Sequence, residues 1–251
     1  MNKRQFLKST LGLSLAPSLA KLLAQPAAAD DELYWAQIRK AYRIKPDYIN
    51  LENGYYNILP EATLEKHIQH IRDVNYQGAY YMRTTQFPDR KAMSKLVAEV
   101  VHCSPDDLIL TRNTTESLDM IIGGFPWQAG DEAVFAIQDY GAMQDMFEQV
   151  ARRQGIVLKK VSLPLHPAND DEIVELYANA ITHKTKLLMV CHMVNVTGQI
   201  LPIRKICDMA HAKGVEVMVD GAHAVAHIEF NLPDLHCDYY GASLHKWLAV
   251  P

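Results

Sequence analysis

VEVMVDGAH, at residues 215–223, is a short apolar run with alternating valines that ends at an acidic residue, Asp220. Such a run, bounded by polar and glycine-containing segments, is typical of a strand buried on both faces of a parallel sheet. An aspartate at the buried end of a strand needs a cationic or hydrogen-bonding partner, because an unpaired carboxylate is costly to bury. We therefore expect Asp220 to meet such a partner at the carboxyl end of this strand.

A second stretch, SLHKW at residues 243–247, places Lys246 between an expected strand and an apolar pair. A lysine amine can form an imine, and a carboxylate can keep a pyridine nitrogen protonated, so the two groups suit an enzyme that holds pyridoxal 5′-phosphate. A surface lysine is the alternative interpretation. Ser243 and His245 alternate with Lys246, so a turn is needed to bring all three to one cofactor.

Strand-like and helix-like segments alternate along the chain, which indicates a layered α/β fold. Two upstream stripes at helical spacing, Leu64 to Ile71 and Met93 to Val101, predict amphipathic helices that face a core. Strands are expected at residues 108–110, 133–137, 156–158, 187–190 and 215–219, and further helices near residues 115–123, 141–154, 170–181 and 203–213.

Polar residues follow these expected strands, and ligands of open α/β sheets bind beyond the carboxyl ends of the strands. Thr114 and Thr115, in TRNTTES at residues 111–117, open a predicted helix, where backbone N–H groups and hydroxyls suit a phosphate. An ordinary threonine N-cap with Glu116 nearby is the alternative.

Three more residues occupy equivalent positions after strands. Tyr140 could lie flat on a cofactor ring, and a partly buried core tyrosine is its alternative. Asn195 could donate its amide to a phenolic oxygen, or serve as a turn residue in a loop that ends at a glycine. His223 could contact the cofactor ring or its O3′ oxygen, and a hydrogen-bonded core histidine is its alternative.

The composition is that of a globular protein. The chain has 251 residues, 49% hydrophobic and 22% charged, with a net charge of −4. It has no basic run outside the extreme N-terminus, so we do not expect nucleic acid as a partner. The expected partners are small metabolites. The four cysteines show neither a CxxC pair nor metal-ligand spacing with the histidines, so we expect buried thiols and no metal site.

Residues 1–29 have the layout of an export signal. Lys3 and Arg4 precede an apolar stretch, and small residues follow it before an acidic cluster. The beginning resembles the twin-arginine motif, with Lys3 in place of the first arginine. We therefore expect a periplasmic or exported protein with no membrane contact once the signal is removed. The alternatives are an amphipathic helix that stays on the protein and a cytoplasmic location.

Taken together, the motifs resemble those of class V aminotransferase-fold enzymes, most closely the isopenicillin N epimerase-like branch, a group that also includes cysteine desulfurases and lyases. The likeness rests on residues 111–117, Asn195 with Thr197-Gly198, residues 220–223 and residues 243–247, and it runs from about Leu51 to Pro251. It implies the large domain of fold-type I pyridoxal-phosphate enzymes, with a mixed, mostly parallel seven-stranded sheet flanked by helices.

The resemblance also implies roles for matching residues. Lys246 would hold the cofactor as an internal aldimine and later move the Cα proton of the substrate, and Asp220 would pair with the pyridine nitrogen. Tyr140 would replace the more common stacking histidine. Asn195 and His223 would lie near the O3′ side of the ring. The phosphate would be held by Thr114, Thr115, Ser243 and His245.

The resemblance further implies an enzyme that acts on an amino acid through an external aldimine and Cα deprotonation, and that forms a homodimer when full length. A cysteine desulfurase or lyase and a non-catalytic pyridoxal-phosphate-binding protein are the alternatives. Family members are usually much longer, so we expect the small C-terminal domain to be missing and the chain to be truncated or a fragment. The expected organisation is a signal at 1–29, a helical segment at 30–105 and an incomplete cofactor-binding large domain at 106–251.

Overall fold

The computed structural model describes residues 32–250, so the expected export signal at residues 1–29 lies outside the described part of the chain. The described residues form two compact units. The first unit comprises residues 32–110 together with residues 244–250, and the second unit is Thr111–Ser243. The division falls after residue 110, and it assigns residues 244–250, which include Lys246, to the first unit.

The second unit is built on a parallel sheet with strand order β2-β1-β3-β4-β5. Four of the expected strands are present, and a short fifth one precedes Ser243. Together with the flanking helices, this arrangement confirms the predicted α/β fold. The strands are β1 (Glu132–Ala136), β2 (Val157–Val161), β3 (Thr185–Cys191), β4 (Glu216–Asp220) and β5 (Tyr239–Gly241).

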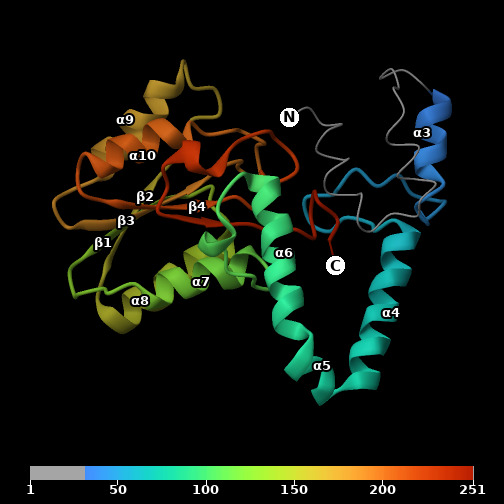
Figure 1. The fold of residues 1–251 in the computed structure, drawn as a ribbon. Coiled ribbons are helices and arrows are strands. Elements are labelled where there is room, and N and C mark those ends of the chain that lie inside the picture. Colours follow the sequence, from blue (N-terminus) through green and yellow to red (C-terminus); the bar gives the residue numbers. More distant parts are fainter. Residues whose placement is uncertain (1–31, 251) are drawn as a thin grey trace. The chain divides into compact units, whose positions relative to one another are not determined.

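Helices cover both faces of this sheet (Figure 1). Because side chains alternate along a strand, neighbouring residues of β1 enter different cores: Val134 packs on the α9 and α10 side, and Phe135 on the α7 and α8 side. All four helices coincide with predicted segments. They are α7 (Thr114–Gly124), α8 (Gly141–Gln154), α9 (Asp170–Ala180) and α10 (Ile203–His211).

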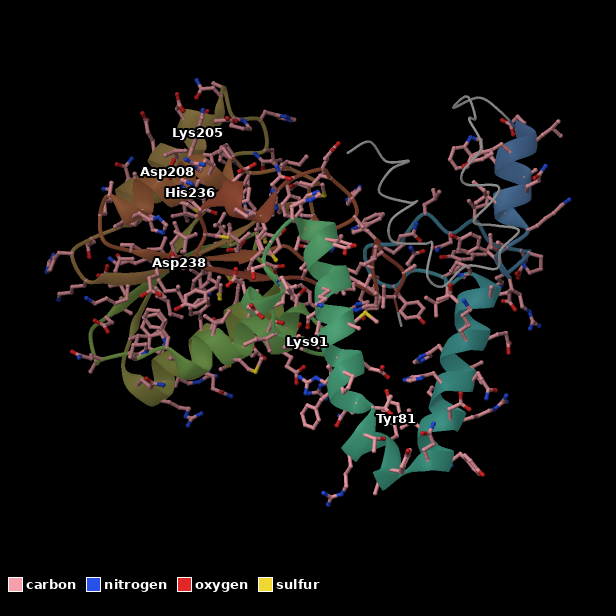
Figure 2. All side chains as sticks on the ribbon, in the orientation of Figure 1. Tyr81, Lys91, Lys205, Asp208, His236 and Asp238 are labelled. Atoms are coloured by element: carbon pink, nitrogen blue, oxygen red, sulfur yellow. The ribbon has the colours of Figure 1, made fainter. Side chains whose placement is uncertain are left out.

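The edge strand β5 is held by side chains as well as by its ladder. Asp238 Oδ2 accepts a hydrogen bond from the Val217 N–H at 2.7 Å, and it lies 2.8 Å from His211 Nε2. His236 Nδ1 lies 3.0 Å from Asp208 Oδ1 of α10, and Figure 2 shows these two side chains beside each other. These contacts tie the approach to β5, which includes the 3-10 turn Leu232–Leu235, to α10 and β4.

The first unit is helical, with α3 (Glu32–Arg39), α4 (Glu61–Gln77), α5 (Ala79–Thr84), α6 (Gln86–Val101) and a 3-10 turn at Pro105–Asp107. Gly78 joins α4 to α5 with a φ of 54°, a conformation that favours glycine. The hydroxyl of Tyr81, labelled in Figure 2, donates a hydrogen bond to Asp89 Oδ2 at 2.7 Å and so links α5 to α6.

Two sequence predictions for this unit are wrong. The stripe of α4 does not face a core, since none of its residues is buried and Ile71 is 53% exposed; the stripe of α6 buries Val101 but leaves Met93 exposed. Residues 108–110 are not a strand, because no neighbouring strand among the described residues pairs with them. None of the described helices is both long and apolar enough to cross a membrane.

Candidate functional site

The carboxyl ends of the adjacent strands β1, β3, β4 and β5 form one edge of the sheet, and the polar residues predicted from the sequence follow these ends. The register pairs Cys191 of β3 with Asp220 of β4, and Asp220 with Gly241 of β5. The last residue of β4 therefore lies in the middle of this edge. This is the place where open parallel sheets bind their ligands.

Asp220 is 5% exposed and its surroundings fix its backbone firmly. Its Oδ1 atom accepts a hydrogen bond from the Ala222 N–H at 2.9 Å, and its carbonyl accepts one from the His192 N–H at 2.9 Å. The next residue, Gly221, donates its N–H to the carbonyl of Gly241 at 2.8 Å. The carboxylate is thus presented by a segment that is bonded to both neighbouring strands.

The N-terminus of α7 meets Ser243 at the same edge. The Thr114 N–H donates to Ser243 Oγ at 3.0 Å, and the two hydroxyl oxygens lie 2.7 Å apart. Asn113, and neither threonine, caps the helix, since its Oδ1 accepts the Glu116 N–H at 2.9 Å. The structure therefore brings together two of the residues predicted to bind phosphate, with Thr115 on the same first turn.

The approach of β5 to α7 requires a glycine. A Cβ atom added at Gly241 would lie 2.7 Å from Leu118 Cδ2 and 3.3 Å from Thr114 Cγ2. Contacts this short are not tolerated by packed side chains, so a larger residue would separate the strand from the helix. The absence of a side chain at Gly241 lets the chain deliver Ser243 to the helix N-terminus.

The other predicted residues of the second unit also follow strand ends. Tyr140 directly precedes α8 and is 47% exposed. Asn195 is exposed in a turn after β3, and the Val194 N–H bonds to the Gln199 carbonyl at 2.9 Å to close that loop. His223 lies half-buried in the turns after β4. All three side chains thus belong to segments that leave the sheet at the same edge as Asp220.

Residues 244–247 of the lysine motif belong to the first unit, and they are not extended. Residues 244–248 form turns, in which the Ala249 N–H donates to the Lys246 carbonyl at 3.3 Å and the Val250 N–H to the Leu244 carbonyl at 3.1 Å. The carbonyl of His245 accepts the Asn57 N–H at 3.3 Å. The turn that the sequence required around Lys246 is therefore present.

Sequence reasoning missed a buried acid at this edge. Asp139 follows β1, is 4% exposed, and accepts the Ala136 N–H through Oδ2 at 2.7 Å. Its Oδ1 is buried and has no hydrogen-bond partner in the described part of the chain. Burial raises the pKa of Asp139 to about 7, and the charge of Asp220 adds to the rise. A signal was available, since an acid shortly after a buried strand is similar to the pattern that singled out Asp220.

A histidine and a tyrosine near Asp220 were also missed. His192 is 4% exposed, and its Nδ1 lies 3.0 Å from the hydroxyl of Tyr240. Burial lowers the pKa of His192 to about 4, so its imidazole is neutral at physiological pH. The sequence placed His192 after a strand but held no sign that β5 brings a tyrosine to it.

The cysteines agree with the expectation only in part. All four thiols are free, with Cys191 and Cys207 buried and Cys103 and Cys237 partly exposed. Burial raises the pKa of Cys191 well above the usual value of a thiol. Because the thiolate is the reactive form, this cysteine is a packing residue and a poor nucleophile.

The family described as aminotransferase class-V matches residues 59–251. An isopenicillin N epimerase of Amycolatopsis lactamdurans is 31% identical over 86% of this chain and 55% of its own length, and a probable cysteine desulfurase of Synechocystis sp. is 28% identical over 85% of this chain and 53% of its own length. A solved structure of the C-DES protein, with glycine covalently linked to its PLP cofactor, matches with a TM-score of 0.72 and 24% identity, over 79% of this chain and 53% of that one. The chain spans about half the length of the curated relatives it matches.

Proposed function

The chain belongs to the aminotransferase class-V family, and from that premise we propose that it binds pyridoxal 5′-phosphate and acts with it on an amino acid. The observation that carries the proposal is the sheet edge itself. It presents a buried carboxylate, Asp220, and a hydroxyl pair at a helix N-terminus, Thr114 with Ser243, from one rigid parallel sheet.

The donor set of this edge fits the cofactor. A phosphate accepts several hydrogen bonds, and the first turn of α7 offers hydroxyls and the positive end of the helix dipole. We assign the phosphate to Thr114, Thr115, Ser243 and His245. The close packing at Gly241 supports this assignment, because it keeps the strand and the helix N-terminus together.

The second part of the fit concerns the ring. A protonated pyridine nitrogen is a suitable partner for the carboxylate of Asp220, since a buried carboxylate is stabilised by a cationic donor. When bound, pyridoxal 5′-phosphate supplies an electron sink for the bond that breaks at the substrate Cα. We assign Tyr140, exposed after β1, to the ring face, and Asn195 and His223 to the O3′ side.

Lys246 is the residue we propose for covalent attachment. Its amine would hold the cofactor and, once the substrate has freed it, would move the proton at the substrate Cα. The motif SLHKW places it three residues after Ser243, which already lies at the helix N-terminus. Epimerisation, transamination and β-elimination share this proton transfer, and the 31% identity to an isopenicillin N epimerase favours epimerisation as the first reaction to assay.

The binding test compares Lys246→Ala with Lys205→Ala. Lys205 is a surface lysine paired with Asp170 and Asp171, so its loss leaves the sheet edge intact. We expect wild type and Lys205→Ala to develop the visible absorbance that pyridoxal 5′-phosphate acquires on bonding to a lysine, and Lys246→Ala to lack it while staying folded. A band of equal strength in dialysed Lys246→Ala would refute the assignment.

Turnover is tested separately, because a binding protein without catalysis is the contrasting possibility. The loaded chain is incubated with single amino acids in deuterated water, and exchange of the Cα proton is followed by NMR. A catalytic protein exchanges that proton with at least one amino acid. A chain that shows the lysine-dependent band but exchanges no Cα proton is a non-catalytic cofactor-binding protein.

We further propose that the protein forms a homodimer and is exported by the twin-arginine route. The exposed apolar residues of the first unit, such as Tyr76 and Phe87, support self-association, and a monomer mass measured by light scattering would contradict it.

The proposal of export rests on the signal-like residues 1–29. Recovery of a tagged chain in the cytoplasmic fraction alone would contradict it.

A further inference from the structure

His192 and Tyr240 reach each other across β4. His192 directly follows β3, and Tyr240 lies in β5 as the register partner of Val219. Since β4 lies between these two strands, a hydrogen bond of 3.0 Å from His192 Nδ1 to the Tyr240 hydroxyl bridges over the end of β4. By register the bridge runs from the position of Val219 to that of Gly221, with Asp220 between them.

His192 and Tyr240 also hold the chain at Asp220. The His192 N–H donates to the Asp220 carbonyl at 2.9 Å. The Tyr240 ring lies against Gly221, where an added Cβ would come within 2.1 Å of ring atoms Cε1 and Cζ. The peptide that follows Asp220 is therefore fixed by a hydrogen bond on one side and by an aromatic ring on the other.

The pair adds no charge next to the carboxylate. Burial lowers the pKa of His192 to about 4 and raises that of Tyr240 well above its usual value. Both side chains are therefore neutral, and one hydrogen bond joins them. Phe230 packs edge-on against the imidazole, with ring centroids 4.8 Å apart and planes at 71°. A neutral, covered bridge restrains position without shifting the charge of Asp220.

We propose that His192 and Tyr240 are positioning residues that hold the Asp220 carboxylate in line for the pyridine nitrogen of the cofactor. The inference rests on the proposed function and deepens it, because it names the side chains that set the geometry of the ring contact. Groups that bind or react must be held to within fractions of an ångström by residues whose own conformations are locked, and this pair supplies that restraint.

The test removes one oxygen atom at a time. Tyr240→Phe deletes the hydroxyl that meets His192, and the matched control Tyr239→Phe deletes a hydroxyl one residue earlier in β5, which donates to Glu216 Oε2 at 2.8 Å on the opposite face. The dissociation constant of pyridoxal 5′-phosphate and the pH profile of the visible band are measured by titration. We expect Tyr240→Phe to weaken binding about tenfold, as loss of an outer partner of a ligand does, and to shift the pH profile.

Coupling to Asp220 separates positioning from simple packing. In an Asp220→Asn background the carboxylate that the pair positions is gone, so Tyr240→Phe should no longer change the dissociation constant. His192→Asn, whose amide oxygen can take the place of Nδ1, should bind the cofactor more tightly than His192→Leu. Melting of the cofactor-free variants shows whether each one folds.

The outcomes are distinct. Equal binding by wild type, Tyr240→Phe and Tyr239→Phe would overturn the inference, and so would a loss of the same size in the Asp220→Asn background. A wild-type chain without a Lys246-dependent band would overturn the proposed function, and this inference with it. Weaker cofactor binding by Tyr240→Phe that occurs only when Asp220 is present supports both the inference and the proposed function.

Discussion

Among single residues, Asp139 is a buried carboxyl group whose charged form the fold disfavours. Its pKa rises from 3.8 to about 7, chiefly because burial removes water, while the hydrogen bond from the Ala136 N–H acts in the opposite direction. The unfolded chain loses this proton near the lower value, and the folded chain keeps it up to the higher one. The contribution of Asp139 to stability is therefore fully present below pH 3.8 and is lost as the pH rises through about 7.

Asp139→Asn tests this reasoning. Asparagine keeps an oxygen for the Ala136 N–H but does not titrate, so the free energy of unfolding of the variant should fall less between about pH 4 and about pH 8 than that of wild type, with a gap of up to about 4 kcal/mol. Denaturant unfolding of the cofactor-free protein at several pH values measures both curves. Parallel curves would show that Asp139 titrates normally.

Among the secondary-structure elements, β1 and α8 are joined by a stacked pair of rings. Phe135 and Phe147 are fully buried, with centroids 4.9 Å apart and planes within 10°. Phe135→Ala removes this contact and leaves a cavity in the α7 and α8 core, so it should lower the free energy of unfolding by about 3–5 kcal/mol. The control is Phe87→Ala in α6, whose ring is 68% exposed and whose loss should cost little. Similar values for both variants in denaturant unfolding would contradict the packing described here.

The elements also show which parts of the fold are readable from sequence. Strands β1, β3 and β4 were predicted because continuous apolar runs are typical of strands buried on both faces. The same reasoning failed at residues 108–110, because an apolar run does not reveal whether a partner strand lies beside it. The stripe of α4 was recognised as helical, but its periodicity could not show whether a second layer covers it.

The positions of the candidate site residues in the fold were predictable from the sequence, and their contacts were not. Asp220 and Tyr140 follow strand ends in the sequence, so the rule for open sheets was enough to place them at one edge. The bridge between His192 and Tyr240 was not predictable, because it depends on which strands are neighbours of β4. Strand order is a property of the whole sheet, and no local pattern in the chain records it.

For the whole molecule, the residues proposed to bind the cofactor are distributed over both units. The second unit contains Asp220, Thr114 and Ser243, and residues 244–250, which belong to the first unit, include Lys246. Continuous apolar runs explain the strands of the buried sheet, and the helix N-terminus at Thr114 supports the proposal of an anionic ligand. Lys246 is the residue through which we propose that this chain holds pyridoxal 5′-phosphate.

The most direct measurement is the site of covalent attachment. The chain is incubated with pyridoxal 5′-phosphate, reduced with borohydride, digested and analysed by mass spectrometry to locate the modified lysine. We expect the reduced cofactor on the peptide that contains Lys246, at a cofactor concentration that leaves surface lysines such as Lys205 unmodified. Attachment spread over surface lysines, with none favouring Lys246, would contradict the account.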